Sequence, residues 1–165
     1  MKNTSNNYSP SGFIKTMAFL HLGISVTPVI LGTLFYFNNN DSKVDVSNTG
    51  DIFMAIVPII ALASIFFGNR IFRKTIQSIP KNASLKDKLN KFQTASIIKY
   101  ALLEGGSLFS IVIFANTQNL VYLIIGAFLI FFLFLQYPTK QTIENALELR
   151  GEDKTKFNRA NTPLD

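Results

Sequence analysis

Residues 96–137 read SIIKYALLEGGSLFSIVIFANTQNLVYLIIGAFLIFFLFLQY, with Lys99 and Glu104 as the only charged residues. An α-helix needs about 20 predominantly apolar residues to cross the roughly 30 Å hydrocarbon core of a bilayer. The polar run NTQN divides the stretch into two such segments. We therefore predict two membrane spans, residues 96–115 and 120–137, joined as a tight antiparallel hairpin.

Two further apolar stretches precede this pair, at residues 13–37 and 52–72. The first is longer than the apolar region of a signal peptide, which has about 7–15 residues, so we expect it to be retained as a span. Together the four segments predict an all-α fold. It is an integral membrane four-helix bundle, formed by residues 13–137 as a single membrane domain.

Apolar and charged residues are segregated along the chain. Hydrophobic residues make up 48% of the 165 residues and charged residues only 16%, against about 25% charged in an average soluble domain. The chain has no cysteine and a single histidine. This composition excludes disulfides and thiolate metal sites and argues against a zinc site. We expect neither a metal nor another cofactor.

Lysine and arginine indicate the orientation of the spans, because short cytoplasmic loops carry an excess of both residues. The loop between the first two spans holds only Lys43, and the loop between the last two holds none. With both termini in the cytoplasm, every basic residue except Lys43 falls on the cytoplasmic side. We therefore predict this orientation and a multi-pass protein of a bacterial inner (plasma) membrane. The net charge of +6 follows from topology and does not indicate nucleic-acid binding.

Three segments outside the spans differ in composition. Residues 1–12 are rich in Asn and Ser, and we expect them to be disordered in the cytoplasm. Residues 138–151 space their apolar positions as a helix does, with Pro138 placed for its start and Gly151 for its end. We predict a short cytoplasmic amphipathic helix there. The charged residues 152–165 are expected to form a disordered tail.

The loop before the third span contains a helix-start signal. Ser84 and Asp87 are spaced as a capping box, in which a hydroxyl and a later acid satisfy free backbone N–H groups. Leu85, Leu89 and Phe92 follow on one helical face. We predict a basic amphipathic segment that contacts anionic lipid headgroups, with a docking surface for a partner as the alternative. The predicted headgroup contacts are Lys86, Lys88, Lys91 and, as an anchor inside the third span, Lys99.

Two ionisable groups lie deeper in the predicted spans, where such groups are costly and mark function by default. Glu104 and His21 each lie about 12 Å from the cytoplasmic start of their spans. A contact between them is geometrically allowed if the first and third helices are adjacent. Tyr100 and Ser107 lie one turn from Glu104 and could add their hydroxyl groups. These four residues are a candidate proton or cation site; the alternative is a hydrogen bond that only holds helices or a partner together.

Small residues share a face on two of the spans. They are Gly105, Gly106, Ser107 and Ser110 in the third span and Ala61, Ala63 and Ser64 in the second. Small side chains let helix backbones approach closely in a membrane. We expect these faces to serve helix packing.

Three runs of residues carry a resemblance to known proteins. They are SLKDKL at residues 84–89, IIKYALLEGG at residues 97–106 and PTK at residues 138–140. The runs resemble small uncharacterised four-transmembrane-helix proteins of Bacteroidota-type bacteria. The resemblance covers the C-terminal half and implies the four-span fold, and that family brings no activity to transfer.

The sequence holds no catalytic signature, since G-x-S-x-G, H-E-x-x-H and Walker motifs are all missing. We therefore predict that the protein is not an enzyme. The leading hypothesis is an accessory or assembly component that lies in the lipid bilayer and binds a membrane protein partner or further copies of itself. The alternative is a small proton- or cation-coupled transporter or channel that uses Glu104 and His21.

Overall fold

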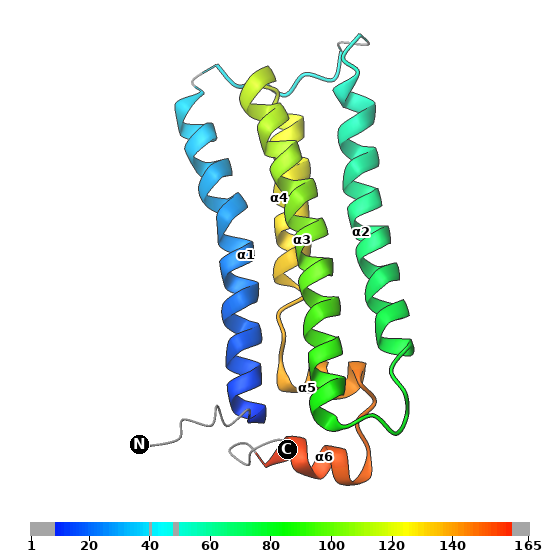
Figure 1. Ribbon diagram of the computed structural model, residues 1–165. Coiled ribbons are helices and arrows are strands. Elements are labelled where there is room, and N and C mark those ends of the chain that lie inside the picture. Colours follow the sequence, from blue (N-terminus) through cyan, green and yellow to red (C-terminus); the bar gives the residue numbers. More distant parts are fainter. Residues whose placement is uncertain (1–8, 40, 48–49, 160–165) are drawn as a thin grey trace, which may run out of the picture.

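The computed structural model describes residues 9–39, 41–47 and 50–159 of the chain (Figure 1). Within these residues the chain is helical, with no strand beyond an isolated bridge between Lys43 and Asn119. The predicted all-α class is confirmed. The helices are α1 (Pro10–Asn38), α2 (Phe53–Gln77), α3 (Leu85–Thr117), α4 (Leu120–Phe134), α5 (Lys140–Ala146) and α6 (Gly151–Asn158).

Three of the helices are long and apolar enough to cross a membrane: α1, α2 and α3, with 29, 25 and 33 residues. These helices therefore support the prediction of a membrane protein. The fourth predicted span differs, because α4 has only 15 residues, about 22 Å of helix, and ends before Tyr137. Pro138 explains the early end. It cannot donate an N–H to the carbonyl of Phe134, and its ring would clash with that carbonyl in a continuing helix.

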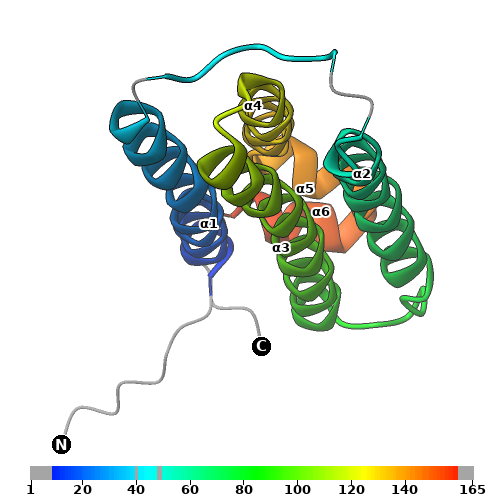
Figure 2. The same ribbon diagram turned by 90° about the horizontal axis from the view of Figure 1, so that it is seen from above.

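Helix α3 lies at the centre of the bundle. It packs against α1, α2 and α4, and α4 also contacts α1 and α2. Helices α1 and α2 flank the α3–α4 pair on opposite sides (Figure 1 and Figure 2). The connection between α3 and α4 consists of Gln118, in the left-handed conformation with φ 56°, and Asn119, whose side chain caps α4. The predicted tight hairpin is confirmed.

The two ends of the bundle differ in charge. The start of α1, the end of α2, the start of α3, and helices α5 and α6 gather at one end, which we call the basic end (Figure 1). The opposite end holds the α1–α2 connection and the α3–α4 turn, where Lys43 accompanies Asp41, Asp45 and Asp51. The basic end carries Arg70, Arg73, Lys74, Lys81, Lys86, Lys88, Lys91, Lys140, Arg150, Lys154, Lys156 and Arg159.

The start of α3 is where the capping signal places it. The Ser84 hydroxyl accepts a hydrogen bond from the backbone N–H of Asp87 at 3.1 Å and donates one to the Asp87 carboxylate at 2.8 Å. The segment runs without a break into the rest of α3, which extends to Thr117. Its apolar face, Leu85, Leu89 and Phe92, is buried in a core cluster that also contains Phe13 of α1, Ile143 of α5 and Phe157 of α6. That face therefore contacts protein and not a membrane surface.

The C-terminal segment differs from its prediction in two ways. The helix expected over residues 138–151 is shorter, since Thr139 caps α5 and the helix ends at Ala146. Gly151, with φ +54°, begins α6 instead of ending α5. The residues expected to be a disordered tail are helical as far as Asn158, because Phe157 inserts its side chain fully into the core. The rest of the predicted tail, from residue 160, lies outside the described residues.

The N-terminal helix also begins earlier than its prediction. Pro10 stands in the first turn of α1, and the Ser9 side chain accepts a hydrogen bond from the Gly12 backbone N–H. A cap and a proline at this position are both favourable for a helix start. Residues 10–12 are thus helical and not disordered, and the remainder of that prediction, residues 1–8, lies outside the described residues.

Candidate functional site

His21 is fully buried between α1, α3 and α4. Its Nε2 donates a hydrogen bond to the Leu133 carbonyl near the end of α4, at 2.9 Å. The imidazole stands edge-on to the rings of Tyr100 and Tyr137, with centroids 4.9 and 5.5 Å away. Nδ1 is buried and has no hydrogen-bond partner in the described part of the chain. The geometry is that of a neutral histidine held in an aromatic cage.

Two α3 side chains hold the segment that follows α4. The Tyr100 hydroxyl donates to the Gln136 carbonyl at 3.1 Å, and the Lys99 ammonium donates to the Gln136 side chain at 2.5 Å. Lys99 also lies over the ring of Phe72, 5.2 Å from its centroid. The last carbonyl groups of a helix have no partner within the helix, and Tyr100 supplies one beyond the end of α4. We call His21, Lys99 and Tyr100, with Leu133 and Gln136, the α4 clasp.

Glu104 does not form the contact with His21 that the sequence allowed. Its carboxylate instead lies near the Thr27 hydroxyl of α1, and that hydroxyl donates its own hydrogen bond to the Gly23 carbonyl at 3.3 Å. His21 faces α4, whereas Thr27 is exposed at the outer edge of α1. Depth along the helices is similar for His21 and Glu104, but rotation about the helix axes turns them to different neighbours.

The expected four-residue polar site is therefore divided among three places. Tyr100 and His21 meet in the α4 clasp. Ser107 donates to the Gly126 carbonyl of α4 at 3.1 Å, where it joins the two helices of the hairpin. Glu104 stands apart, half-buried, at the edge between α1 and α3.

The packing residues separate into an inner and an outer set. A Cβ atom on Gly106 would lie 2.5 Å from the Ser64 Oγ and 3.1 Å from the Ser64 Cβ, so α2 and α3 meet at this glycine. Ser64 and Ala61 are buried on α2, and the Ser110 hydroxyl bonds back to the Gly106 carbonyl at 2.9 Å. Gly105 is exposed, and a Cβ there would meet no atom within 4 Å. Gly105 therefore packs against no helix of this chain, contrary to expectation.

The lysines expected at lipid headgroups also have different surroundings. Lys88 forms an ion pair with Asp153 of α6 at 2.6 Å and donates to the Lys81 carbonyl at 3.4 Å. Lys86 and Lys91 are exposed. Lys99 belongs to the α4 clasp. The structure therefore leaves Lys86 and Lys91 open to a membrane surface, while Lys88 fastens α6 to α3.

An outward face between α1 and α3 combines small residues with the Glu104 carboxylate. We call Gly23, Thr27, Ala101, Glu104 and Gly105 the α1–α3 seam. Like Gly105, Gly23 has nothing within 4 Å of a Cβ added to it. Other outward faces of the bundle carry large apolar side chains that suit lipid, including those of Phe19, Leu62, Phe66, Phe128 and Phe131. The seam is thus the outward face on which a half-buried acid lies beside two glycines.

Two participants in these clusters escaped the sequence reasoning. Thr27 carries no signal of its own, since a threonine in a membrane helix ordinarily bonds to its own backbone. Gln136 does have a recognisable sequence signal, because it is a polar residue at the end of an apolar run and two positions before a proline. A polar side chain near a helix-breaking residue marks backbone groups that need partners.

Replacing His21 by phenylalanine is expected to lower the free energy of unfolding by about 1 kcal/mol. The larger ring fills the aromatic cage, and only the bond to Leu133 is lost. Unfolding in mixed detergent–dodecyl sulfate micelles measures the change, with Tyr100→Phe as the matched loss of the other carbonyl donor. A loss near 4 kcal/mol would contradict the assignment of His21 as chiefly a packing residue.

In the residues that the structure describes, no three His, Asp or Glu side chains lie together as a metal site. The polar groups within the bundle bond chiefly to backbone carbonyls, while Glu104 lies at its edge. Comparison with protein-family models, curated proteins and solved structures finds no match to this chain.

Proposed function

We propose that the protein is a non-enzymatic accessory or assembly component of a bacterial inner membrane, which binds a partner membrane helix along the α1–α3 seam. The observation that carries this proposal is the position of Glu104. It lies half-buried at an outward edge, beside glycines that leave room for another backbone.

The proposed membrane placement follows from helix length and charge. Twenty residues of α3 counted back from Thr117 reach Ile98, about 30 Å away. Lys99 on α3, Arg70 on α2 and Lys15 on α1 then mark one boundary of the hydrocarbon, and the basic end projects into the cytoplasm. Helix α4 and the extended segment after it together have the length to cross, which makes four spans with both termini inside.

In this placement Glu104 lies about 7 Å inside the hydrocarbon. A charged side chain costs about 2.5–3.5 kcal/mol at the centre of a membrane helix and less at this depth. Thr27 offers only one hydroxyl to a carboxylate that has several acceptor sites. A partner helix with a Lys, Arg, Asn or Gln side chain at the same depth would satisfy the rest. Two copies meeting at the seam about a twofold axis would place two carboxylates together, which favours a different protein as the partner.

The alternative function, proton or cation transport through Glu104 and His21, has weaker support. His21 is bonded to Leu133 of α4, whereas Glu104 lies near Thr27 of α1. The hydroxyl groups of Tyr100 and Ser107 are bonded to backbone carbonyls of the α4 region. These bonds join helices and do not connect one ionisable group to the next.

Replacing Gly105 by leucine is expected to abolish partner binding while the protein remains folded, because the new side chain fills the seam and meets no atom of this chain. Glu104→Gln keeps the shape and loses the charge, and is expected to weaken binding about fivefold. The measurement is affinity purification from native membranes in mild detergent, with the native mass of the eluted complex. Ala55→Leu, which adds the same side chain on an exposed face of α2, is the matched control.

A different membrane protein in fixed stoichiometry, lost in Gly105→Leu and retained in Ala55→Leu, would support the proposal and name the process served. A homo-oligomer that all variants preserve would contradict it. A folded Glu104→Gln protein that loses pH-dependent ion flux in liposomes would favour the transport alternative.

A further inference from the structure

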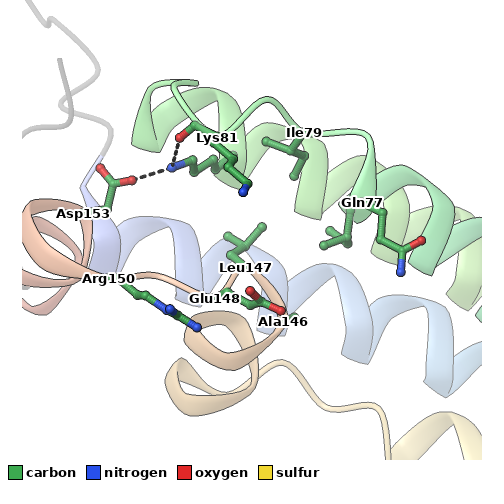
Figure 3. Close-up of a pocket in the computed structure, with 10 residues that line it drawn as sticks. Gln77, Ile79, Lys81, Ala146, Leu147, Glu148, Arg150 and Asp153 are labelled. Carbon is green, nitrogen blue, oxygen red and sulfur yellow. Dashed lines mark hydrogen bonds and ion pairs between the residues drawn. The ribbon is translucent and has the colours of Figure 1, made fainter.

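A pocket of about 540 Å³ opens at the basic end, between the end of α2, the α2–α3 connection, the start of α3 and the α5–α6 connection (Figure 3). It involves neither the α4 clasp nor the α1–α3 seam. Lys81 extends from one wall, and Glu148 and Arg150 come from the opposite wall. The pocket therefore joins two segments that lie far apart in the sequence.

Only some of the charged side chains around the pocket have an ion-pair partner. Lys88 is already paired with Asp153 and bonded to the Lys81 carbonyl. Lys81, Arg150 and Glu148 form no ion pair within the described residues. Two cations and one carboxylate are therefore available to a ligand that itself carries both signs of charge.

The remaining wall of the pocket is partly apolar, with Ile76, Ile79 and Leu147. In the proposed placement Ile76 lies six residues beyond Arg70, about 9 Å from the hydrocarbon boundary. Headgroups and interfacial regions extend a bilayer from about 30 Å to about 40–45 Å, which is roughly 5–7.5 Å on each side. Ile76 therefore lies at the outer edge of the headgroup region, where an amphiphilic ligand would find a charged and an apolar surface together.

We infer that this pocket binds a phosphate ester that carries an amine, of the phosphoethanolamine class. The phosphate lies between Lys81 and Arg150, and the ammonium lies at Glu148. A guanidinium binds phosphate through paired N–H groups, and lysine adds a point charge. The carboxylate distinguishes this ligand from a purely anionic headgroup, which it would repel. The lipid form of the ligand rests on the membrane placement given under the proposed function.

The test uses the purified full-length chain in detergent, with lipid retention measured by native mass spectrometry. Phosphatidylethanolamine and phosphatidylglycerol with identical acyl chains are the probes. Lys81→Gln combined with Arg150→Gln is expected to reduce retention of phosphatidylethanolamine at least about tenfold. Lys86→Gln combined with Lys91→Gln removes the same charge from α3 positions that do not line the pocket and is expected to change nothing. Glu148→Gln is expected to abolish the preference for phosphatidylethanolamine.

Calorimetry with soluble glycerophosphoethanolamine separates the two sources of the ligand. Retention of the lipid without binding of the soluble ester supports a membrane source, and binding of the ester supports a soluble one. Equal losses in the pocket and control double variants, or no preference between the two lipids, would overturn the inference. Partner binding at the seam, measured on the same variants, is expected to be unchanged, so failure of the pocket and failure of the seam are distinguishable.

Discussion

Replacing Gly106 by leucine is expected to lower the free energy of unfolding by about 3 kcal/mol. Even a single Cβ atom there would lie 2.5 Å from the Ser64 Oγ of α2 and 3.2 Å from the Leu129 Cδ1 of α4. A leucine must therefore push α2 or α4 away from α3. Because α3 contacts every other long helix, the displacement disturbs the centre of the bundle. Unfolding in mixed detergent–dodecyl sulfate micelles gives the value.

The neighbouring glycine supplies the control. Gly105→Leu adds the same atoms one position along the same helix, where a Cβ meets nothing within 4 Å, and it is expected to unfold like the natural protein. Ser64→Gly is expected to recover part of the stability lost in Gly106→Ala, because it removes both Ser64 atoms from the contact. Equal losses for the two leucine variants would contradict the close approach of α2 and α3.

Replacing Phe157 by alanine is expected to destabilise the docking of α6 by about 3–5 kcal/mol. The ring is fully buried and belongs to the same core cluster as Leu89 and Ile143. Helix α6 has only eight residues, and apart from this ring two ion pairs join it to the chain, Lys88 with Asp153 and Lys154 with Glu144. An eight-residue helix without a docking surface is not stable in water.

Limited trypsin digestion in detergent measures this docking, because Lys154 and Lys156 lie within α6. In the Phe157→Ala protein both sites are expected to be cut at least tenfold faster, while the three long helices stay intact. Asn158→Ala, a change at the next and exposed position, is expected to leave the digestion unchanged. Protection of α6 in the Phe157→Ala protein would show that the ion pair and other contacts suffice.

The sequence predicted the elements whose causes are local. Hydrocarbon length requires long apolar helices, and these appear as α1, α2 and α3. The start of α3 follows from Ser84 and Asp87, since a cap depends on atoms within one turn. The hairpin between α3 and α4 follows from the short polar run between them, which can join two helices only when they lie side by side and antiparallel.

What the sequence could not reveal depends on rotation about the helix axes and on contacts between distant segments. Glu104 and His21 lie at similar depth, as their positions indicate, yet one turns to Thr27 and the other to Leu133. Gly105 and Gly106 are neighbouring glycines that the sequence does not distinguish, but only Gly106 faces other helices of the bundle.

The polar C-terminal segment shows the same distinction. Its composition resembles that of a disordered tail, but Phe157 joins the buried core cluster that contains Leu85, Leu89 and Phe92, about seventy positions away. Burial of Phe157 in that cluster orders α6. The sequence of residues 152–158 alone does not show that such a cluster exists. Local patterns therefore indicate helix caps and the apolar segments long enough to cross a bilayer, whereas packing between distant segments orders α6 and determines which side chains meet.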